Sequence, residues 1–299
     1  MPPRPFVPPE LTVGPFHQNT AFAAGLTRHQ LASKCWVRLF RSVYVHHLVE
    51  LTDELRFEAL RLAAPADAVA TGLTAAWLFG VWTPPPGETV PLHLALPNRG
   101  EYREAGVRTS RLVVDEGDIG TWHGVPVTNP ERTCFGLMTR SSRMEATVWA
   151  DAFLYRGLVT KHGLNRYADE RPHWPYVRRV RAALELARTR ARSMMESRLR
   201  LVIVYRGVDE PPLLNEPIYG PDGELLGIPD MGYPVRVPFG LEYDGEQHRE
   251  PDHHAADLVR ENRLLVVGNY PLLRYGALDV YRYADRTAAQ VAAMLRRCS

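Results

Sequence analysis

Apolar and polar residues alternate most clearly in the last third of the chain, where short apolar runs end in carboxylates. Ile228-Pro-Asp230 closes one run, and Leu241-Glu-Tyr-Asp-Gly245 closes the next at a glycine turn. Runs of this length bounded by turn residues predict strands. Gly220-Pro-Asp-Gly223 predicts a hairpin turn between strands at 216–219 and 224–230. The pattern therefore predicts several carboxylates gathered at strand ends.

Helices are predicted on both sides of these strands. The pattern predicts a long helix from Tyr176 into Arg200 and another from His254 to Val267, whose inward residues are Leu258, Leu264 and Leu265. A strand at 271–274 and a last helix at 285–297 follow. The order of helix, three strands, helix, strand and helix predicts a small α/β core in residues 173–299.

The first 50 residues have the pattern of a winged helix-turn-helix. A short helix at 18–24 stops at Gly25, Thr27 caps a second helix that runs through Lys34, and 36–47 alternates as a two-stranded wing. Arg28 and Lys34 are predicted on the recognition helix. Arg38 and Arg41 are predicted near DNA phosphates. The alternative is a small packing module that binds no DNA, because many helical hairpins share this pattern.

Residues 51–172 predict a mixed middle domain. The stretch 53–80 is expected to be helical, 92–96, 107–114 and 125–128 are expected to be strands, and helices are expected to begin at Pro130 and Met144. Pro172–Pro175 is the predicted boundary with the last domain. The chain is thus predicted to be an α/β protein of α+β multidomain type, with domains at 1–50, 51–172 and 173–299.

Composition indicates an ordinary globular protein. The 299 residues are 45% apolar and 23% charged, which suits two or three domains. The cysteines Cys35, Cys134 and Cys298 form no C-x-x-C pair, which favours a reducing cytoplasm. The N-terminus lacks the apolar core of a signal peptide, and no apolar run reaches membrane-spanning length. We expect a cytoplasmic protein without a membrane partner.

Charge is distributed unevenly, although the net charge is only +2. From Arg171 to Arg206 there are ten arginines against two glutamates, and from Asp209 to Asp257 there are twelve acids against two arginines. A basic helix followed by an acidic pocket suits a nuclease, with Arg192 and Arg200 at phosphates. The alternative for the arginine run is a solvated amphipathic helix.

The acidic strand ends suggest a metal site. Carboxylates gathered together repel one another and are costly to desolvate unless a cation neutralises them. Oxygen ligands are those that Mg²⁺ or Mn²⁺ prefers, and Asp230 and Glu242 are the first candidates. Asp244 is either a further ligand or an ordinary Asp-Gly turn residue. The alternative for the whole cluster is a solvated hairpin with acidic tips.

Residues 195–297 resemble the very-short-patch repair endonucleases within the PD-(D/E)XK nuclease class. The resemblance rests on an ordered set of motifs: Glu196-Ser-Arg-Leu-Arg200, Pro229-Asp230, Leu241-Glu-Tyr-Asp-Gly-Glu-Gln-His248, Asp257-Leu-Val-Arg260 and Gly268-Asn-Tyr-Pro-Leu-Leu-Arg274. The resemblance implies that Asp230, Glu242 and Glu196 hold the metal, that His248 moves a proton, and that Arg260 aims at a phosphate.

The resemblance has departures and ordinary alternatives. The lysine of the class is replaced by Asp244, and the zinc ligands of the very-short-patch enzymes have no counterpart. Glu196 could instead be a surface glutamate paired with a neighbouring arginine on its helix. Asp257 and Arg260, one turn apart, are typical of a structural salt bridge. A degenerate site that only binds DNA therefore stays open beside an active one.

The front half resembles the AbiEi-type antitoxin and regulator family. The matching motifs are Thr71-Gly-Leu-Thr-Ala-Ala-Trp-Leu-Phe-Gly80 and Gly124-Val-Pro-Val-Thr-Asn-Pro-Glu-Arg-Thr133. This resemblance implies DNA binding through the N-terminal winged helix. Two functions remain: a metal-dependent DNA endonuclease of repair or defence type, or an antitoxin-type regulator with a non-catalytic nuclease fold. The partners are DNA and a cognate toxin or repair protein.

Overall fold

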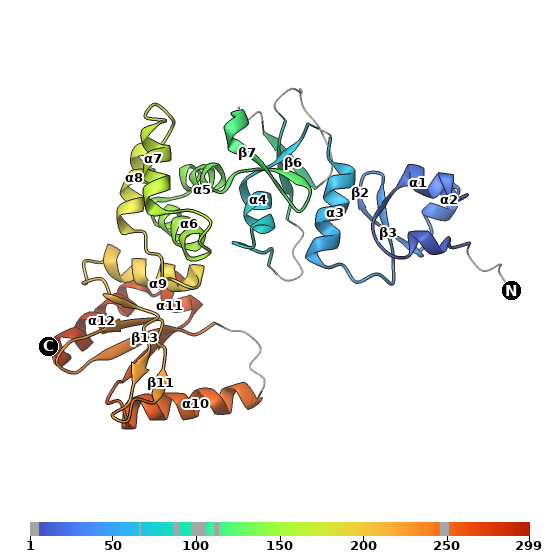
Figure 1. Cartoon of the computed structure of the whole chain (residues 1–299). Coiled ribbons are helices and arrows are strands. Elements are labelled where there is room, and N and C mark those ends of the chain that lie inside the picture. Colours follow the sequence, from blue (N-terminus) through green and yellow to red (C-terminus); the bar gives the residue numbers. More distant parts are fainter. Residues whose placement is uncertain (1–5, 66, 86–89, 97–105, 111–113, 246–250) are drawn as a thin grey trace. The chain divides into compact units, whose positions relative to one another are not determined.

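The chain forms two compact units, residues 1–133 and 134–299. The structure, a computed structural model, describes residues 6–65, 67–85, 90–96, 106–110, 114–245 and 251–299, with the backbone alone for 251–256. Helices and sheets occur in both units, which confirms the mixed α/β class (Figure 1). The three-domain division at residues 50 and 172 stays a prediction. Among the described residues, no helix has the length and apolar character that crossing a membrane requires.

The first part of unit 1 contains two short helices followed by a two-stranded wing, in the predicted order. Its elements are η1 (Pro9–Leu11), β1 (Phe16–His17), α1 (Gln18–Ala23), α2 (Arg28–Leu31), β2 (Trp36–Phe40) and β3 (Val43–His46). The three strands form an antiparallel sheet in the order β1-β3-β2. Gly25 ends α1 with a φ of 90°, a conformation that favours glycine. We call residues 16–46 the wing module.

The second helix of the wing module is shorter than predicted. Thr27 does cap it, with the side chains of Thr27 and Gln30 forming a reciprocal capping box. However, α2 ends at Leu31 rather than at Lys34. Trp36 is buried and packs edge-on against Phe16 with 5.3 Å between ring centroids. Because this anchor draws the chain into β2, Lys34 lies in the connecting turn.

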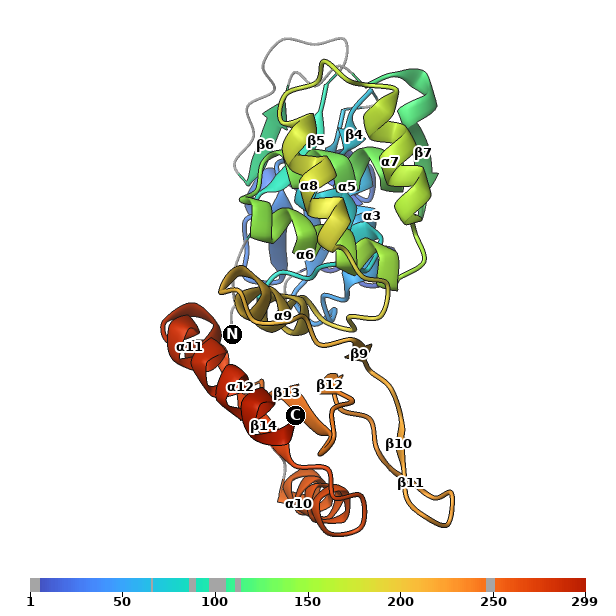
Figure 2. The same cartoon turned by 90° about the vertical axis from the view of Figure 1, so that its left-hand side faces the viewer.

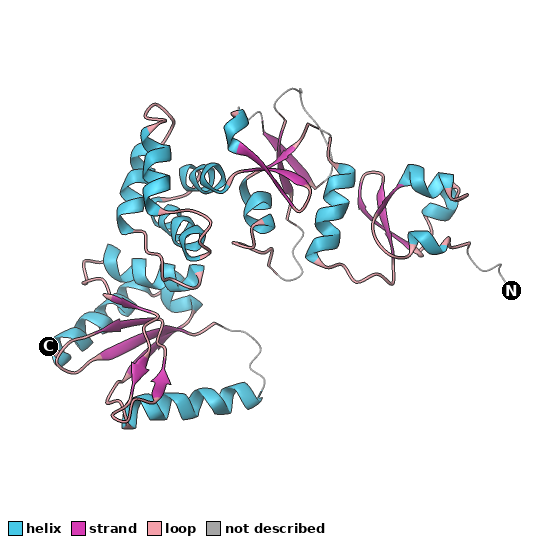
Figure 3. Ribbon diagram, in the orientation of Figure 1, coloured by secondary structure: helices cyan, strands magenta, loops and turns pink. Residues whose placement is uncertain are grey.

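The rest of unit 1 is a five-stranded sheet with helices. Its elements are α3 (Asp53–Ala63), β4 (Val69–Ala70), α4 (Gly72–Leu78), β5 (Leu92–Ala95), β6 (Val107–Ser110), η2 (Glu116–Asp118), β7 (Ile119–Trp122) and β8 (Val125–Thr128). The strand order is β6-β5-β4-β8-β7. Figure 3 shows the strands in magenta and the helices in cyan. The prediction of one helical stretch over 53–80 is wrong, because β4 interrupts it. Val69 and Ala70 are buried and pair with β5, and Ala70 also pairs with β8.

Unit 2 begins with a helical layer. After α5 (Pro130–Thr139), which starts in unit 1, come α6 (Arg143–Tyr155), α7 (Lys161–Asp169), α8 (Val177–Leu186) and α9 (Met194–Tyr205). The predicted single helix from Tyr176 into Arg200 is therefore two helices. The chain turns extended at Ala187, with ψ of 142°, and Ser193 starts α9 by accepting a hydrogen bond from Glu196 N at 3.1 Å.

The C-terminal part of unit 2 contains the predicted strands and helices in order, together with two short strands and a short helix that were not predicted. It contains β9 (Leu213–Leu214), β10 (Ile218–Tyr219), β11 (Leu225–Gly227), β12 (Met231–Tyr233), β13 (Phe239–Tyr243), α10 (Pro251–Val266), β14 (Leu272–Tyr275), α11 (Ala277–Tyr281) and α12 (Ala284–Cys298). The main sheet has the order β14-β13-β12-β9, while β10 and β11 form a separate hairpin. Helices α9, α11 and α12 lie together along the sheet, and α10 lies beside β11 (Figures 1 and 2).

The inward face of α10 differs from the prediction. Leu264 is fully buried against Leu226 and Tyr270. Leu258 and Leu265 are exposed, at 46% and 51% of their surface. The reason is that α10 packs against the narrow β10–β11 hairpin, which covers one leucine and leaves its neighbours outside.

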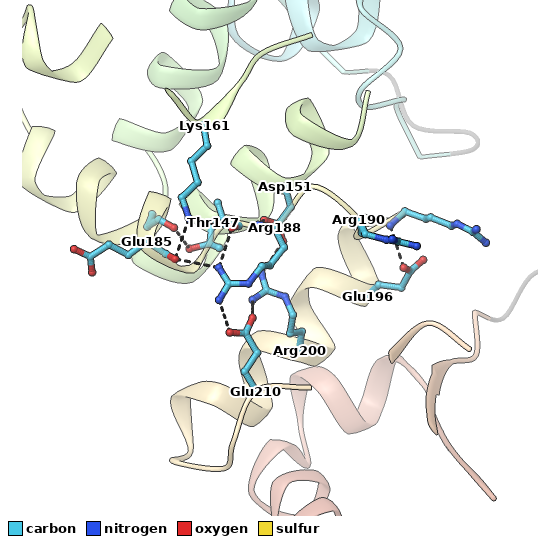
Figure 4. Close-up of polar contacts among 12 residues, drawn as sticks. Thr147, Asp151, Lys161, Glu185, Arg188, Arg190, Glu196, Arg200 and Glu210 are labelled. Carbon is cyan, nitrogen blue, oxygen red and sulfur yellow. Dashed lines mark hydrogen bonds and ion pairs between the residues drawn. The ribbon is translucent and has the colours of Figure 1, made fainter. Parts of the chain in front are cut away.

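Helix α9 joins the helical layer to the sheet through a buried ion-pair network. Arg200 is 0% exposed and donates to Asp151 of α6 at 2.8 Å. Glu210 accepts hydrogen bonds from both Arg200 and Arg188 (Figure 4). Burial raises the pKa of Asp151, and the Arg200 guanidinium and the Arg188 N–H offset part of that rise. The network neutralises two carboxylates that would otherwise be desolvated alone.

Removing the central arginine of this network tests its contribution to stability. Arg200→Met leaves Asp151 without its buried cation and removes one of the two arginines at Glu210, so the free energy of unfolding should fall by about 3–5 kcal/mol. Arg206→Met is the matched control, because its partner Asp285 is 95% exposed and such surface pairs contribute about 0–1 kcal/mol. Urea denaturation of the full chain, followed by tryptophan fluorescence, measures both losses. Equal losses of unfolding free energy in the two variants would show that the buried network stabilises the fold no more than a surface ion pair does.

Candidate functional site: an acidic pocket and a basic wing

The strand register brings Asp230 and Glu242 together. Strand β13 pairs antiparallel with β12, Met231 opposite Leu241, and continuing that register sets Asp230 opposite Glu242. The carboxylate of Asp230 accepts a hydrogen bond from Tyr243 N at 2.8 Å. Asp230, Glu242 and Asp244 line the same pocket, whose volume is about 650 Å³. We call this the acidic pocket.

Glu242 is held by arginines from two other elements. Arg260 of α10 donates to both of its carboxylate oxygens, Nη1 to Oε1 at 2.6 Å and Nη2 to Oε2 at 3.1 Å. On the other side, β13 runs parallel to β14 with Glu242 opposite Arg274, whose Nε lies 3.5 Å from Oε2. Glu242 is only 6% exposed. Its charge is thus neutralised within the protein.

The carboxyl group of Asp230, beside Glu242, has a raised pKa. Burial, reinforced by the charges of Glu196 and Glu242, raises the pKa of Asp230 to about 7, against the opposing effects of the Tyr243 N–H and Arg260. Near neutral pH a large share of Asp230 side chains therefore carries a proton. The acidic pocket is less negative than its sequence indicates.

Glu196 serves the start of its own helix. Its Oε2 accepts hydrogen bonds from Arg192 N at 3.0 Å and from Asn215 Nδ2 at 2.9 Å, and the residue is 8% exposed. Its negative charge contributes to the raised pKa of Asp230. It does not line the acidic pocket, so the structure brings together Asp230, Glu242 and Asp244, with Glu196 behind them. The alternative of a surface glutamate is wrong, because Glu196 is buried.

The remaining predicted residues of this site have mixed placements. His248 lies outside the described residues. Asp257 and Arg260 form the predicted salt bridge, with 3.8 Å between Arg260 Nε and Asp257 Oδ1, but the stronger partner of Arg260 is Glu242. The role of Arg274 was missed by sequence reasoning. The parallel pairing of β13 with a strand some thirty residues later leaves no local signal for it.

The described residues of the acidic pocket do not fit a divalent cation as they are arranged. Mg²⁺ and Mn²⁺ bind through lone pairs of carboxylate oxygens, which compete with hydrogen bonds for the same positions. Both oxygens of Glu242 are already bonded to guanidinium groups. Across the described part of the chain, no group of three His, Cys, Asp or Glu side chains has metal-binding geometry. Binding of Mg²⁺ or Mn²⁺ by Asp230, Glu242 and Glu196 stays a prediction.

The arginine run of α8 and α9 is largely bonded within unit 2. Arg198 donates to both oxygens of Glu145 at 2.8 Å, Arg190 pairs with Glu216 at 2.7 Å, and Arg200 belongs to the buried network. The placement of Arg200 at DNA phosphates is corrected by its complete burial. Arg192 contributes a backbone hydrogen bond to Glu196. The local excess of positive charge is mostly an internal counter-charge.

Exposed cations gather instead on the wing module. Arg28 lies at the start of α2, Lys34 in the turn before β2, Arg38 on β2 and Arg41 at the tip of the β2–β3 hairpin. All four side chains are exposed. The hairpin tip is made by Ser42 with a φ of 64°. A cationic surface of this kind, on a short helix, a turn and a wing, is chemically suited to a phosphate backbone.

The middle of the chain matches a known family. Residues 68–186 match the family model of the AbiEi antitoxin C-terminal domain. This range includes both motifs of the front half, residues 71–80 and 124–133. The match ends at residue 186, so the likeness of residues 195–297 to the very-short-patch endonucleases stays a prediction.

Relatives of similar length occur in Mycobacterium tuberculosis. Uncharacterized protein Rv2248 of strain H37Rv and uncharacterized protein MT2308 of strain CDC 1551 are each 28% identical over 270 residues, which is 87% of this chain and 93% of theirs. A crystal structure of the RV2827C protein from the same species aligns with a TM-score of 0.39 and 14% identity, over 70% of this chain and 84% of that one.

The raised pKa of Asp230 predicts a pH-dependent stability. Between the unfolded value of 3.8 and about 7 the folded protein binds more protons at this group, so the free energy of unfolding falls as pH rises through that window. Asp230→Asn lacks this titration and still accepts the Tyr243 N–H. From about pH 5 to about pH 8 the variant should therefore gain stability relative to wild type, on the order of a few kcal/mol.

Urea denaturation at several pH values measures this difference. Asp222→Asn, in the exposed turn of the β10–β11 hairpin, is the control for the loss of a surface carboxyl group. A constant difference for Asp230→Asn would mean that its carboxyl group ionises normally.

Proposed function

We propose that this chain is an AbiEi-type antitoxin regulator that binds duplex DNA through its wing module. The observation that carries the proposal is the match of residues 68–186 to the AbiEi antitoxin C-terminal domain. Antitoxins act against a toxin, so a cognate toxin is the proposed protein partner. The proposal assigns DNA recognition to residues 16–46 and no catalytic step to the acidic pocket.

The arrangement of charge supports this division of roles. The exposed cations of the wing module lie on three successive elements: the start of α2, the turn before β2, and the β2–β3 hairpin. A wing and a short helix that carry cations can contact phosphates on both sides of a groove. The arginines of unit 2 are mostly engaged by carboxylates, which reduces what they can offer to DNA.

A triple substitution tests DNA binding by the wing module. Replacing Arg28, Lys34 and Arg41 by alanine should weaken duplex binding and lower the salt dependence, because each lost phosphate contact removes about 0.9 from the log–log slope. Fluorescence anisotropy with a labelled mixed-sequence duplex over a series of NaCl concentrations measures both quantities.

The control for this test removes the same charge elsewhere. Arg61, Arg108 and Arg156 are exposed and lie outside the wing module, so their triple alanine variant loses the same three charges. It should keep most of the slope. Equal loss of affinity and slope in both triple variants would indicate attraction by net charge alone, and the wing module would then be a packing element.

A metal-dependent endonuclease is the second candidate, favoured by one observation. Asp230, Glu242 and Asp244 lie in one pocket at the ends of β12 and β13. In this case supercoiled, linear, mismatched or single-stranded DNA should be cleaved with Mg²⁺ or Mn²⁺, and not with EDTA. Asp230→Asn should abolish that cleavage while leaving DNA affinity equal or higher, since it removes a negative charge near the phosphates. Binding without cleavage of any of the four forms would exclude it under these conditions.

A further inference from the structure

We propose that Arg260 is an internal cation of the acidic pocket, which takes the place of a divalent metal ion at Glu242 and fastens α10 to the sheet. The inference does not depend on the DNA-binding role of the wing module. It assigns to this chain a pocket whose charge is balanced by its own side chains.

The geometry at Glu242 is that of a two-point clamp. The two terminal nitrogens of Arg260 each reach one carboxylate oxygen, at 2.6 Å and 3.1 Å. This bidentate arrangement is the strongest that a carboxylate and a guanidinium form. A metal ion at Glu242 needs the same oxygens. A metal ion chelated by both oxygens would need the inner lone pairs that Arg260 uses, so the two cations compete for Glu242.

A second arginine, Arg274, adds positive charge at Glu242. Arg274 lies on β14, directly opposite Glu242 in the parallel register, with its Nε 3.5 Å from Oε2. Its Nη1 also lies 3.4 Å from Glu261 of α10. Two guanidinium groups therefore lie at one buried carboxylate. An entering divalent cation would be repelled by both.

Helix α10 depends on this clamp because its apolar contact is small. Among the described side chains of α10, Leu264 is the one that is fully buried. A side chain on Gly227 of β11 would meet Leu264 at 2.9 Å and Arg260 Cγ at 3.5 Å, so the helix packs closely over this strand. Leu258, Val259, Leu265 and Val266 are exposed. The pair between Arg260 and Glu242 is thus a principal attachment of α10.

Thermal unfolding of the full chain, with EDTA, Mg²⁺ or Mn²⁺, tests the proposal. The wild-type Tm should be the same in all three. In EDTA, Arg260→Leu should lower the Tm by roughly 5–10 °C, because it leaves Glu242 buried with a weaker partner. Mn²⁺ should restore part of that loss by occupying the freed oxygens. Glu242→Gln in the same chain should abolish the restoration.

Arg263→Leu provides the matched control, since Arg263 lies three residues along the same helix and is exposed. It should change the Tm little and give no response to Mn²⁺. Arg260→Gln gives the same comparison should Arg260→Leu not fold. A wild-type Tm that rises with Mn²⁺ and loses this rise in Glu242→Gln would overturn the proposal. So would an Arg260 variant whose Tm Mn²⁺ leaves unrestored, or one as stable as Arg263→Leu.

Discussion

The buried contact between Arg200 and Asp151 is the interaction on which unit 2 depends. Arg200 comes from α9 and Asp151 from α6, at 2.8 Å and without solvent. The same helix, α9, contributes Leu199, Val202 and Ile203 to the core of the sheet. Helix α9 therefore packs both against the helical layer and against the sheet. The pair is costly to separate because either partner alone would be a desolvated charge.

The same principle governs the acidic pocket. A carboxylate at the end of a buried strand must be neutralised, and the protein does this in two ways. Glu242 receives guanidinium groups from Arg260 and Arg274, while burial raises the pKa of Asp230 so that it holds a proton more readily. Both solutions operate without an added ion.

Local patterns in the sequence were enough to place some of the strands. The glycine turn after Asp244 and the apolar run before Glu242 indicate β13. The run before Asp230 forms β11 instead, and β12, whose pairing with β13 brings the two carboxylates together, begins after Asp230 and was not predicted. The cap at Thr27 was likewise evident. These features depend on neighbours in sequence, so periodicity and turn residues reveal them.

Features that depend on distant partners were not predictable. The basic run over 171–206 indicated a DNA surface, yet Arg200 pairs with Asp151, 49 residues away, and Arg198 with Glu145, 53 residues away. A count of charges cannot show which of them meet a carboxylate in the fold. The break between α8 and α9 escaped prediction for a similar reason. Arg188 N donates to Asp151 of α6, a contact that supports the extended segment from outside the run.

Hydrogen–deuterium exchange of the full chain, with and without duplex DNA, tests most directly whether the wing module binds DNA and the acidic pocket does not. Amides buried by a ligand exchange more slowly, so each segment reports on its own contact. The account predicts slower exchange in residues 16–46 and unchanged exchange in β12 and β13, residues 231–243. Slower exchange confined to residues 231–243, with residues 16–46 unchanged, would contradict it.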